Sequence, residues 1–315
     1  MEPPAFDTIH LPKPPTGWFD HSYAVLMDGT LGILRTSHDL HAEMQAWRAR
    51  VAQSQHTSGW PNPDHRRQIS AFDGVSESGA IDLPKHGLFP AMDRSADGRW
   101  LVVEPRSDPE TRNARFYRPD GRPAGEFHAG DGIERIRCAP DGTVWVGYFD
   151  EGVFGGQTPD GQWPVGSSGI ARFDSEGQLL WGFNDPAGEV LIADCDALTL
   201  DGNVAWACTF TDFPILKIDN GQVRIWKNEV SSARALAVDG HHVLIAGGYR
   251  PEHNRLALVR LSEETNDSAL IGEIEFDLPS GGASLIQGRG DTLHVVGDGR
   301  WTKISVEDVR QALSV

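Results

Sequence analysis

Short apolar runs alternate with tight-turn signals along this chain, and the run after a turn often contains Trp. An Asp-Gly pair, or a close equivalent, supplies the positive φ angles of a two-residue hairpin loop. Each copy therefore predicts two antiparallel strands joined by a short turn. The copies recur at spacings of about 40 to 70 residues, in the segments 25–29, 95–100, 139–145, 200–206, 238–240 and, in degenerate form, 288–293.

Two further strands can be read around the hairpins. In the second copy, apolar runs at 88–92, 99–103, 114–117 and 125–128 are separated by turn residues. Four antiparallel strands make one blade of a β-propeller. The sequence therefore predicts an all-β, six-bladed propeller that forms a single domain over residues 1–315, with blades at about 15–84, 86–129, 131–184, 191–228, 231–278 and 281–306.

The last blade lacks a fourth strand, because the chain turns helical after residue 306 and ends. Residues 6–12 resemble the outer strands expected at 79–84 and 275–279, and all three segments end in Leu-Pro. We predict that residues 6–12 complete the last blade and close the ring, which removes an exposed sheet edge. A short C-terminal helix should follow this blade.

The amino-acid composition disfavours two classes of binding partner. The 315 residues carry a formal net charge of −17, which disfavours nucleic acid and anionic membrane surfaces as partners. The first residues have no basic and apolar signal-peptide pattern, so a cytoplasmic location is expected. Cys138, Cys195 and Cys208 are too few and too scattered for a disulfide framework, and we expect them to be buried.

The long insertions all join the second strand of a blade to its third, at 36–66, 104–113, 148–169, 209–214 and 247–255. They must share one face of the disc, opposite the hairpin turns, and loops on a rigid scaffold commonly carry function. The first insertion predicts a helix with Ser37 as its N-cap and Leu40, Met44, Trp47 and Val51 on one side. This helix either packs on the disc or forms a lid.

Charged and polar residues precede the inner strands, where they should ring the central funnel on the loop face. One interpretation is a set of ion pairs that brace neighbouring blades, such as Arg135 or Arg137 with Asp194 or Asp196. The other is a binding site, with His21, Glu134 and Asp196 as catalytic candidates. The candidate ligand-binding residues are Asp20, His21, Arg135, Tyr148, Asp150, Asp194, Asp196, Arg234 and Tyr249.

The repeats resemble those of the six-bladed propeller superfamily that includes the SMP-30/gluconolactonase group, NHL repeats and streptogramin-lyase-like proteins. The segment 140–147, Pro-Asp-Gly-Thr-Val-Trp-Val-Gly, is also similar to the two-component-regulator propeller repeat. The resemblance covers nearly the whole chain, but blade patterns specify a fold far better than a function.

The resemblance implies an alternative, a hydrolase or lyase with its site at the funnel mouth. SMP-30-like lactonases hold a divalent cation with one Glu, one Asp and two Asn; here Asp20, Asp194 and Asp196 are the candidate ligands for Ca²⁺ or another divalent cation, but no Asn precedes an inner strand. Streptogramin-lyase-like chemistry implies a His and Glu pair, for which His21 and Glu134 are candidates.

A non-catalytic scaffold is the favoured interpretation. Long loops on one face and the absence of a nucleophile motif suit a propeller that holds a protein, a peptide or a small molecule over its funnel, without a cofactor. A cluster of carboxylates with perturbed pKa values at the funnel mouth would favour the enzyme, whereas a salt-bridged channel beneath an apolar loop surface would favour the scaffold.

Overall fold

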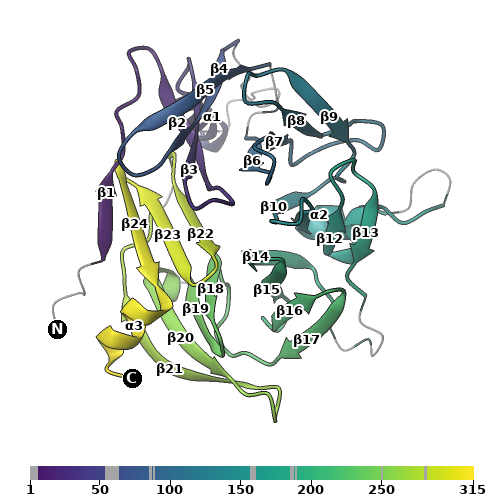
Figure 1. The fold of residues 1–315 in the computed structure, drawn as a ribbon, viewed down its shortest axis with the longest axis vertical. Coiled ribbons are helices and arrows are strands. Elements are labelled where there is room, and N and C mark those ends of the chain that lie inside the picture. The colour runs from purple at the N-terminus through teal and green to yellow at the C-terminus, as the bar shows by residue number, and fades with distance from the viewer. Residues whose placement is uncertain are drawn as a thin grey trace.

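The computed structural model describes residues 6–53, 64–84, 87, 89–156, 161–184, 188, 190–249, 251–279 and 282–315. In this part of the chain the strands form six antiparallel sheets of four strands, arranged as a ring around a central axis (Figure 1). The predicted six-bladed propeller is therefore confirmed.

Each of the first three blades takes its strands in chain order, from the axis outward. Blade 1 consists of β2 (Phe19–Val25), β3 (Leu31–Thr36), β4 (Arg67–Phe72) and β5 (Glu77–Leu83). Blade 2 consists of β6 (Ala91–Arg94), β7 (Trp100–Val103), β8 (Ala114–Tyr117) and β9 (Pro123–Phe127). Blade 3 consists of β10 (Ile133–Cys138), β11 (Val144–Tyr148), β12 (Ile170–Phe173) and β13 (Leu179–Gly182).

The next two blades repeat this order, and the last one does not. Blade 4 consists of β14 (Asp194–Asp201), β15 (Val204–Phe210), β16 (Ile215–Asp219) and β17 (Gln222–Trp226). Blade 5 consists of β18 (Ala235–Asp239), β19 (His242–Ala246), β20 (Arg255–Leu261) and β21 (Ser268–Glu275). Blade 6 consists of β22 (Leu285–Arg289), β23 (Thr292–Gly297), β24 (Arg300–Ser305) and β1 (Asp7–His10).

The N-terminal strand closes the ring, as predicted. β1 lies antiparallel to β24, with Ile9 opposite Trp301, and the amide of Leu11 donates to the Gly299 carbonyl oxygen at 2.9 Å. In Figure 1 this strand runs beside β24, so the first and last segments of the chain share one sheet. The closure covers the outer edge of β24, which would otherwise present unpaired backbone groups.

The core lies between the blades rather than inside one central cluster. Among the described residues, six buried hydrophobic clusters each join two neighbouring blades. Between blades 2 and 3, for example, the ring centroids of Phe127 and Phe173 lie 5.4 Å apart. Each blade is thus held on both sides, which makes the ring a rigid support for its loops.

Few helices accompany the strands. Helix α1 (Leu40–Ala52) lies in the blade 1 insertion, and its N-cap is Asp39, not the predicted Ser37. The Asp39 carboxylate accepts from the Ala42 amide at 2.9 Å, while the Ser37 hydroxyl accepts from the Arg66 amide, also at 2.9 Å, and so closes the base of the insertion. Leu40 and Met44 are buried, whereas Val51 is exposed.

The remaining helices are short. They are α2 (Asp150–Val153), the 3₁₀ turns η1 (Val165–Ser168) and η2 (Glu252–Asn254), and the predicted C-terminal helix α3 (Val306–Leu313). Ser305 and Asp308 form a capping box at the start of α3. No helix in the described ranges is long and apolar enough to cross a membrane.

Candidate functional site at the mouth of the central funnel

The inner strands begin on the loop face, and their first residues surround a cavity of about 380 Å³. Its lining comes from the starts of β2, β6, β10 and β22 and from Arg234, which directly precedes β18. The predicted working face therefore has a cavity on the propeller axis. Its charged lining residues, within the described part of the chain, are Glu134, Arg135, Arg137 and Arg234.

Three inner strands carry a register shift where they enter the funnel. The shifts fall between Asp20 and Ser22 in β2, between Ile133 and Arg135 in β10, and between Asp194 and Ala197 in β14. A bulge of this kind redirects side chains at the end of a sheet and is common beside binding sites. The three catalytic candidates, His21, Glu134 and Asp196, all lie in these shifted segments.

Asp20 belongs to an ion-pair network within blade 1. Its carboxylate accepts from Arg35 Nε at 2.7 Å and from the Tyr23 hydroxyl at 3.0 Å, and Arg35 also pairs with Glu77. Burial, and after it the Asp20 charge, raise the pKa of Tyr23 above its usual range. Asp20 is thus held by its neighbours in the blade and does not line the cavity.

His21 packs among aromatic rings beneath helix α1. It is 2% exposed, and its ring centroid lies 5.1 Å from that of His41 and 5.1 Å from that of Phe89. The His41 Nε2 atom lies 2.7 Å from the His21 carbonyl oxygen, which ties α1 to the first inner strand. The structure therefore places His21 in the attachment of the insertion helix, outside the lining of the cavity that contains Glu134.

Arg135 links blades 3 and 4, but not through the predicted pair of carboxylates. It donates to the backbone oxygen of Asp196 at 2.7 Å and pairs with the neighbouring Glu134 carboxylate. The Asp194 carboxylate accepts from the Asp150 amide at 2.9 Å, at the start of α2. The expected contact between the two blades exists, but a backbone carbonyl takes the place of the acid.

The Asp196 carboxyl is left close to other acids. Burial, and after it the Asp194 charge, raise the pKa of Asp196 to about 6, although Arg135 acts in the opposite direction. A carboxyl with such a pKa changes its charge near neutral pH and could exchange a proton with a ligand.

Arg137 lies deeper in the funnel. It is 8% exposed; its Nη1 atom donates to the Ile136 carbonyl oxygen at 2.6 Å, and its Nε atom is buried without a hydrogen-bond partner. Below it, Arg289 pairs with Asp93 at 2.8 Å and joins blades 6 and 2. This ion pair thus links the inner strands β22 and β6, deeper along the funnel than the cavity lining.

The remaining predicted residues have separate environments. Tyr148 is buried and donates to the Ala129 carbonyl oxygen at 2.6 Å, so it supports the blade 3 insertion. Asp150 is exposed at the start of α2. Arg234 lines the cavity, and its guanidinium reaches the Pro279 carbonyl oxygen at 3.4 and 3.5 Å. Tyr249 is exposed on the blade 5 loop, with its ring against Phe213.

The residues at the mouth do not fit a divalent cation. Hard cations need several oxygen ligands, and no three His, Cys, Asp or Glu side chains converge in the described ranges. The cavity itself presents three guanidinium groups and one carboxylate among its described lining residues. A lactonase-like metal site is not formed by Asp20, Asp194 and Asp196.

Some residues of the site were missed at the sequence level, namely Ser22, Asp93, Gln287 and Arg289. The Gln287 side chain is buried and exchanges hydrogen bonds with the backbone of Val25 in the neighbouring blade 1, at 3.1 and 2.8 Å. Polar residues inside otherwise apolar inner strands were the available signal, since such groups are costly to bury unless they have partners.

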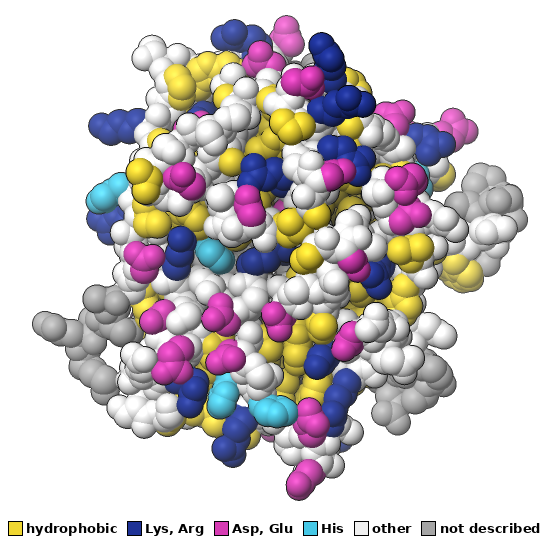
Figure 2. Space-filling model, in the orientation of Figure 1, with side chains coloured by type: hydrophobic (Ala, Val, Ile, Leu, Met, Phe, Trp, Pro, Cys, Tyr) yellow, Lys and Arg dark blue, Asp and Glu magenta, His cyan; other side chains and the backbone are white. Residues whose placement is uncertain are grey.

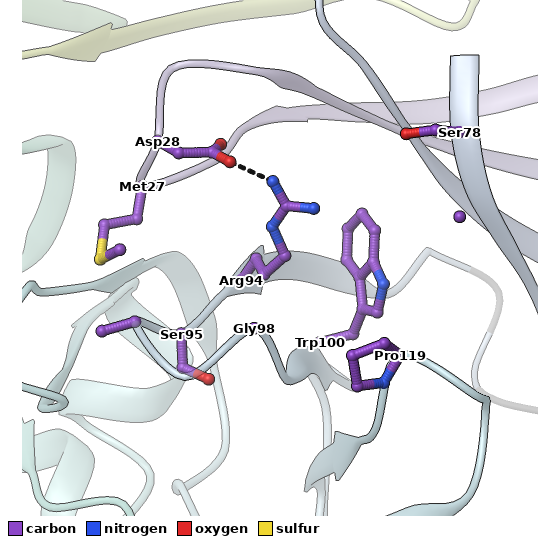
Figure 3. Close-up of a pocket in the computed structure, with 10 residues that line it drawn as sticks. Met27, Asp28, Ser78, Arg94, Ser95, Gly98, Trp100 and Pro119 are labelled. Carbon is purple, nitrogen blue, oxygen red and sulfur yellow. Dashed lines mark hydrogen bonds and ion pairs between the residues drawn. The ribbon is translucent and has the colours of Figure 1, made fainter.

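A second cavity, of about 310 Å³, lies on the opposite face between blades 1 and 2. Figure 3 shows Arg94 pointing toward Asp28, its ion-pair partner, with the Trp100 ring beside it. The Asp28 carboxylate neutralises Arg94, the only Arg among the described residues that line this cavity. The funnel cavity therefore has more uncompensated charge in its lining.

The surface charge is spread out rather than gathered. On the face in Figure 2, acidic and basic side chains are interspersed among the coloured residues, and hydrophobic side chains lie between them. On this face the charges are therefore not gathered in one patch, and the net charge of the chain does not by itself set the sign of the field inside the funnel.

No protein-family model and no curated relative matches the chain. Among solved structures, a chain of the mitotic checkpoint complex matches with a TM-score of 0.53 at 9% identity, over 94% of this chain and 79% of that one. The propeller domain of Myceliophteria thermophila Cps50 (Swd1) matches with a TM-score of 0.51 at 11% identity, over 95% and 100%. The chain is a six-bladed β-propeller.

A further match is a catalytically inactive virginiamycin B lyase from Staphylococcus aureus with quinupristin. Its TM-score is 0.48 at 16% identity, over 96% of this chain and 100% of that chain. At these identities a likeness concerns the fold alone, so the function of this propeller must be argued from its own site.

Proposed function

We propose that this propeller is a binding module that holds a ligand in the funnel on its loop face and does not transform it. The observation that carries the proposal is the cavity where the inner strands begin, two of whose lining strands, β2 and β10, carry a bulge at this end. A preformed concave site on a rigid support is the usual form of a small-molecule site.

The acid and base candidates support binding over catalysis because most of their side chains are already engaged in contacts within the propeller. His21 anchors α1, Asp20 is held by Arg35 and Tyr23, and Glu134 pairs with Arg135. A propeller of the same fold is part of the mitotic checkpoint complex, which is consistent with use of the scaffold for binding.

The segments of the loop face also carry exposed aromatic side chains. Phe89 precedes β6, Phe154 and Trp163 lie in the blade 3 insertion, and Tyr249 lies in the blade 5 loop; Trp163 is 65% exposed. Exposed aromatic side chains are typical of recognition surfaces. We place the protein in the cytoplasm, because its three cysteines are unpaired and buried.

The proposal can be tested by blocking the funnel. Ser284 lines the cavity, and Ser284→Trp should fill its mouth, whereas Ser78→Trp places the same side chain at the cavity on the other face. Small-molecule ligands found by a thermal-shift screen should bind the wild type and Ser78→Trp, but not Ser284→Trp, in titration calorimetry. Equal binding by both tryptophan variants would refute the funnel as the site.

One observation favours a second candidate, a hydrolase or lyase. The Asp196 carboxyl, with its pKa raised to about 6 by burial and Asp194, could act as an acid or base at the funnel mouth. An activity on lactone or ester substrates that follows an ionisation near this pKa, and that is lost in Asp196→Asn while the variant still folds, would replace the binding-module proposal.

A further inference from the structure

The funnel cavity has a charge opposite to that of the whole chain. Its described lining contains Arg135, Arg137 and Arg234 against Glu134 alone, so 3 − 1 gives +2, in a chain of formal charge −17. We propose that the cavity selects small organic anions and binds their carboxylate or phosphate group between Arg137 and Arg234. This inference rests on the proposed ligand-binding function of the funnel.

The buried guanidinium of Arg137 has no carboxylate bound to it in the described part of the chain. Among the described residues its Nη1 donates to the carbonyl oxygen of Ile136, and its buried Nε has no hydrogen-bond partner. A buried guanidinium without a carboxylate is costly. Burial, and after it the Arg289 charge, lower the pKa of Arg137 to about 9, although the Asp93 charge acts in the opposite direction. The Asp93 carboxylate forms its ion pair with Arg289. A bound anion would supply the missing acceptor and the missing charge.

The other donors approach the cavity from different blades. Arg234 forms only long contacts with the Pro279 carbonyl oxygen, and among the described residues it has no ion-pair partner within 4 Å. Its pKa is lowered by burial and then by Arg135. From blade 1, the Ser22 hydroxyl is buried in the lining without a partner. Donors from blades 1, 3 and 5 thus surround one space.

The remaining polar groups leave room for an anion. Arg135 is engaged by Glu134 and the Asp196 carbonyl oxygen, and Gln287 is engaged by Val25, so the unused donors are those of Arg137, Arg234 and Ser22. Apolar lining residues complete the cavity: Ala24, Ala91, Met92, Ile136, Leu285 and Ile286. A volume of about 380 Å³ accepts a small acid with a hydrocarbon body.

The experiment compares probes of one shape and different charge on the full chain. Benzoate and phenyl phosphate carry the two anionic groups, benzylamine carries a cation, and benzyl alcohol is neutral; inorganic phosphate tests the anion without a body. We expect both organic anions to bind at least tenfold more tightly than benzylamine or benzyl alcohol in titration calorimetry. Raising the salt from about 50 to about 300 mM should weaken them.

Two arginine variants identify the site. Arg137→Gln and Arg234→Gln should each weaken benzoate and phenyl phosphate at least tenfold, while Arg94→Gln, an equal charge change at the opposite cavity, should leave the affinity unchanged. Arg137→Gln should also raise or preserve the unfolding midpoint, because it removes an uncompensated buried charge. If Arg137 instead stabilised the contact between blades, its replacement would lower that midpoint, so the midpoint distinguishes a binding role from a structural one.

Several results would overturn the inference. Equal binding of the amine, the alcohol and the anions would show that the funnel does not select charge, although the binding-module proposal would stand. Unchanged affinity in both arginine variants would do the same. Anion binding that persists in Ser284→Trp would place the site elsewhere and would count against the binding-module proposal as well. No binding by any probe at about 10 mM would refute the anion site.

Discussion

His294 should make the free energy of unfolding of the propeller depend on pH, by an amount that follows from the shift of its pKa. The residue lies on β23, is buried, and accepts through Nδ1 a hydrogen bond from Trp301 Nε1 at 3.1 Å. Burial, and after it the Lys303 and Arg289 charges, lower the pKa of His294 from 6.5 to about 3. The folded protein therefore holds this imidazole neutral across the physiological range.

The sign follows from proton binding. Below a pH of about 6.5 the unfolded chain binds a proton at this histidine that the folded chain refuses, so the free energy of unfolding falls as the pH falls. Between about pH 7.5 and pH 5.0 the loss from this one residue is about 2 kcal/mol. It would continue toward the folded pKa of about 3.

The assay is urea unfolding of the wild type and His294→Gln at several pH values in this range. Gln keeps an acceptor for Trp301 but does not titrate, and the carboxylates of both proteins titrate alike, so the difference between the two isolates His294. We expect this difference to shrink by about 2 kcal/mol from pH 7.5 to pH 5.0. A difference that stays constant with pH would refute the assigned neutral, depressed histidine.

Three further predictions concern the ring itself. Gly288→Ala should destabilise by about 3 kcal/mol or more, because an added Cβ would lie 1.7 Å from the Leu236 carbonyl oxygen of the neighbouring inner strand; chemical unfolding will show whether the strands can move apart at lower cost. A chain that begins at Pro12 lacks β1, so its free energy of unfolding should fall by about 2 to 4 kcal/mol and it should tend to associate through the exposed edge of β24. Light scattering and chemical unfolding that match those of the full chain would contradict this. Arg289→Gln leaves the Asp93 carboxylate buried and unpaired, which should cost about 3 to 5 kcal/mol; a loss below about 1 kcal/mol would show that backbone amides suffice to hold that charge.

The fold was predictable because its information is local and repeated. Asp-Gly turns number the hairpins, and the shared Leu-Pro ending connected residues 6–12 with the outer strands, a pairing that the contact of β1 with β24 confirms. The side of the disc that carries the insertions also followed, because turns and insertions alternate along each blade. None of these steps needs the position of a side chain.

The site was predictable only in part, because it depends on how side chains turn at the ends of strands. The sequence placed His21 at the funnel mouth, but a register shift and the packing of α1 bury it against His41 and Phe89. It paired Arg135 with an aspartate side chain, where the structure uses the Asp196 backbone. Bulges and backbone acceptors have no residue type of their own, so a single sequence does not reveal them.

The choice of acceptors separates Arg137 and Arg234 in the funnel from the arginines on the opposite face of the disc. On the face that carries the hairpin turns, Arg172 pairs with Asp141 and Arg94 pairs with Asp28, and each carboxylate cancels a positive charge. In the funnel, Arg137 donates to a backbone carbonyl oxygen, and Arg234 makes only long contacts with one. A carbonyl accepts a hydrogen bond without neutralising the donor, so the positive charge of these two arginines is not cancelled by a carboxylate.

This difference also explains how an acidic chain can favour an anion at one point. Exposed carboxylates more than about 8 to 10 Å from the cavity are largely screened by salt at physiological ionic strength, whereas guanidinium groups inside the cavity act on a ligand at short range, where salt screens them less. The near charges therefore decide the sign of the local potential. If the funnel arginines served only to brace the blades, carboxylate partners would stabilise them better than carbonyl oxygens do, and the uncancelled charge of Arg137 would be a pure cost.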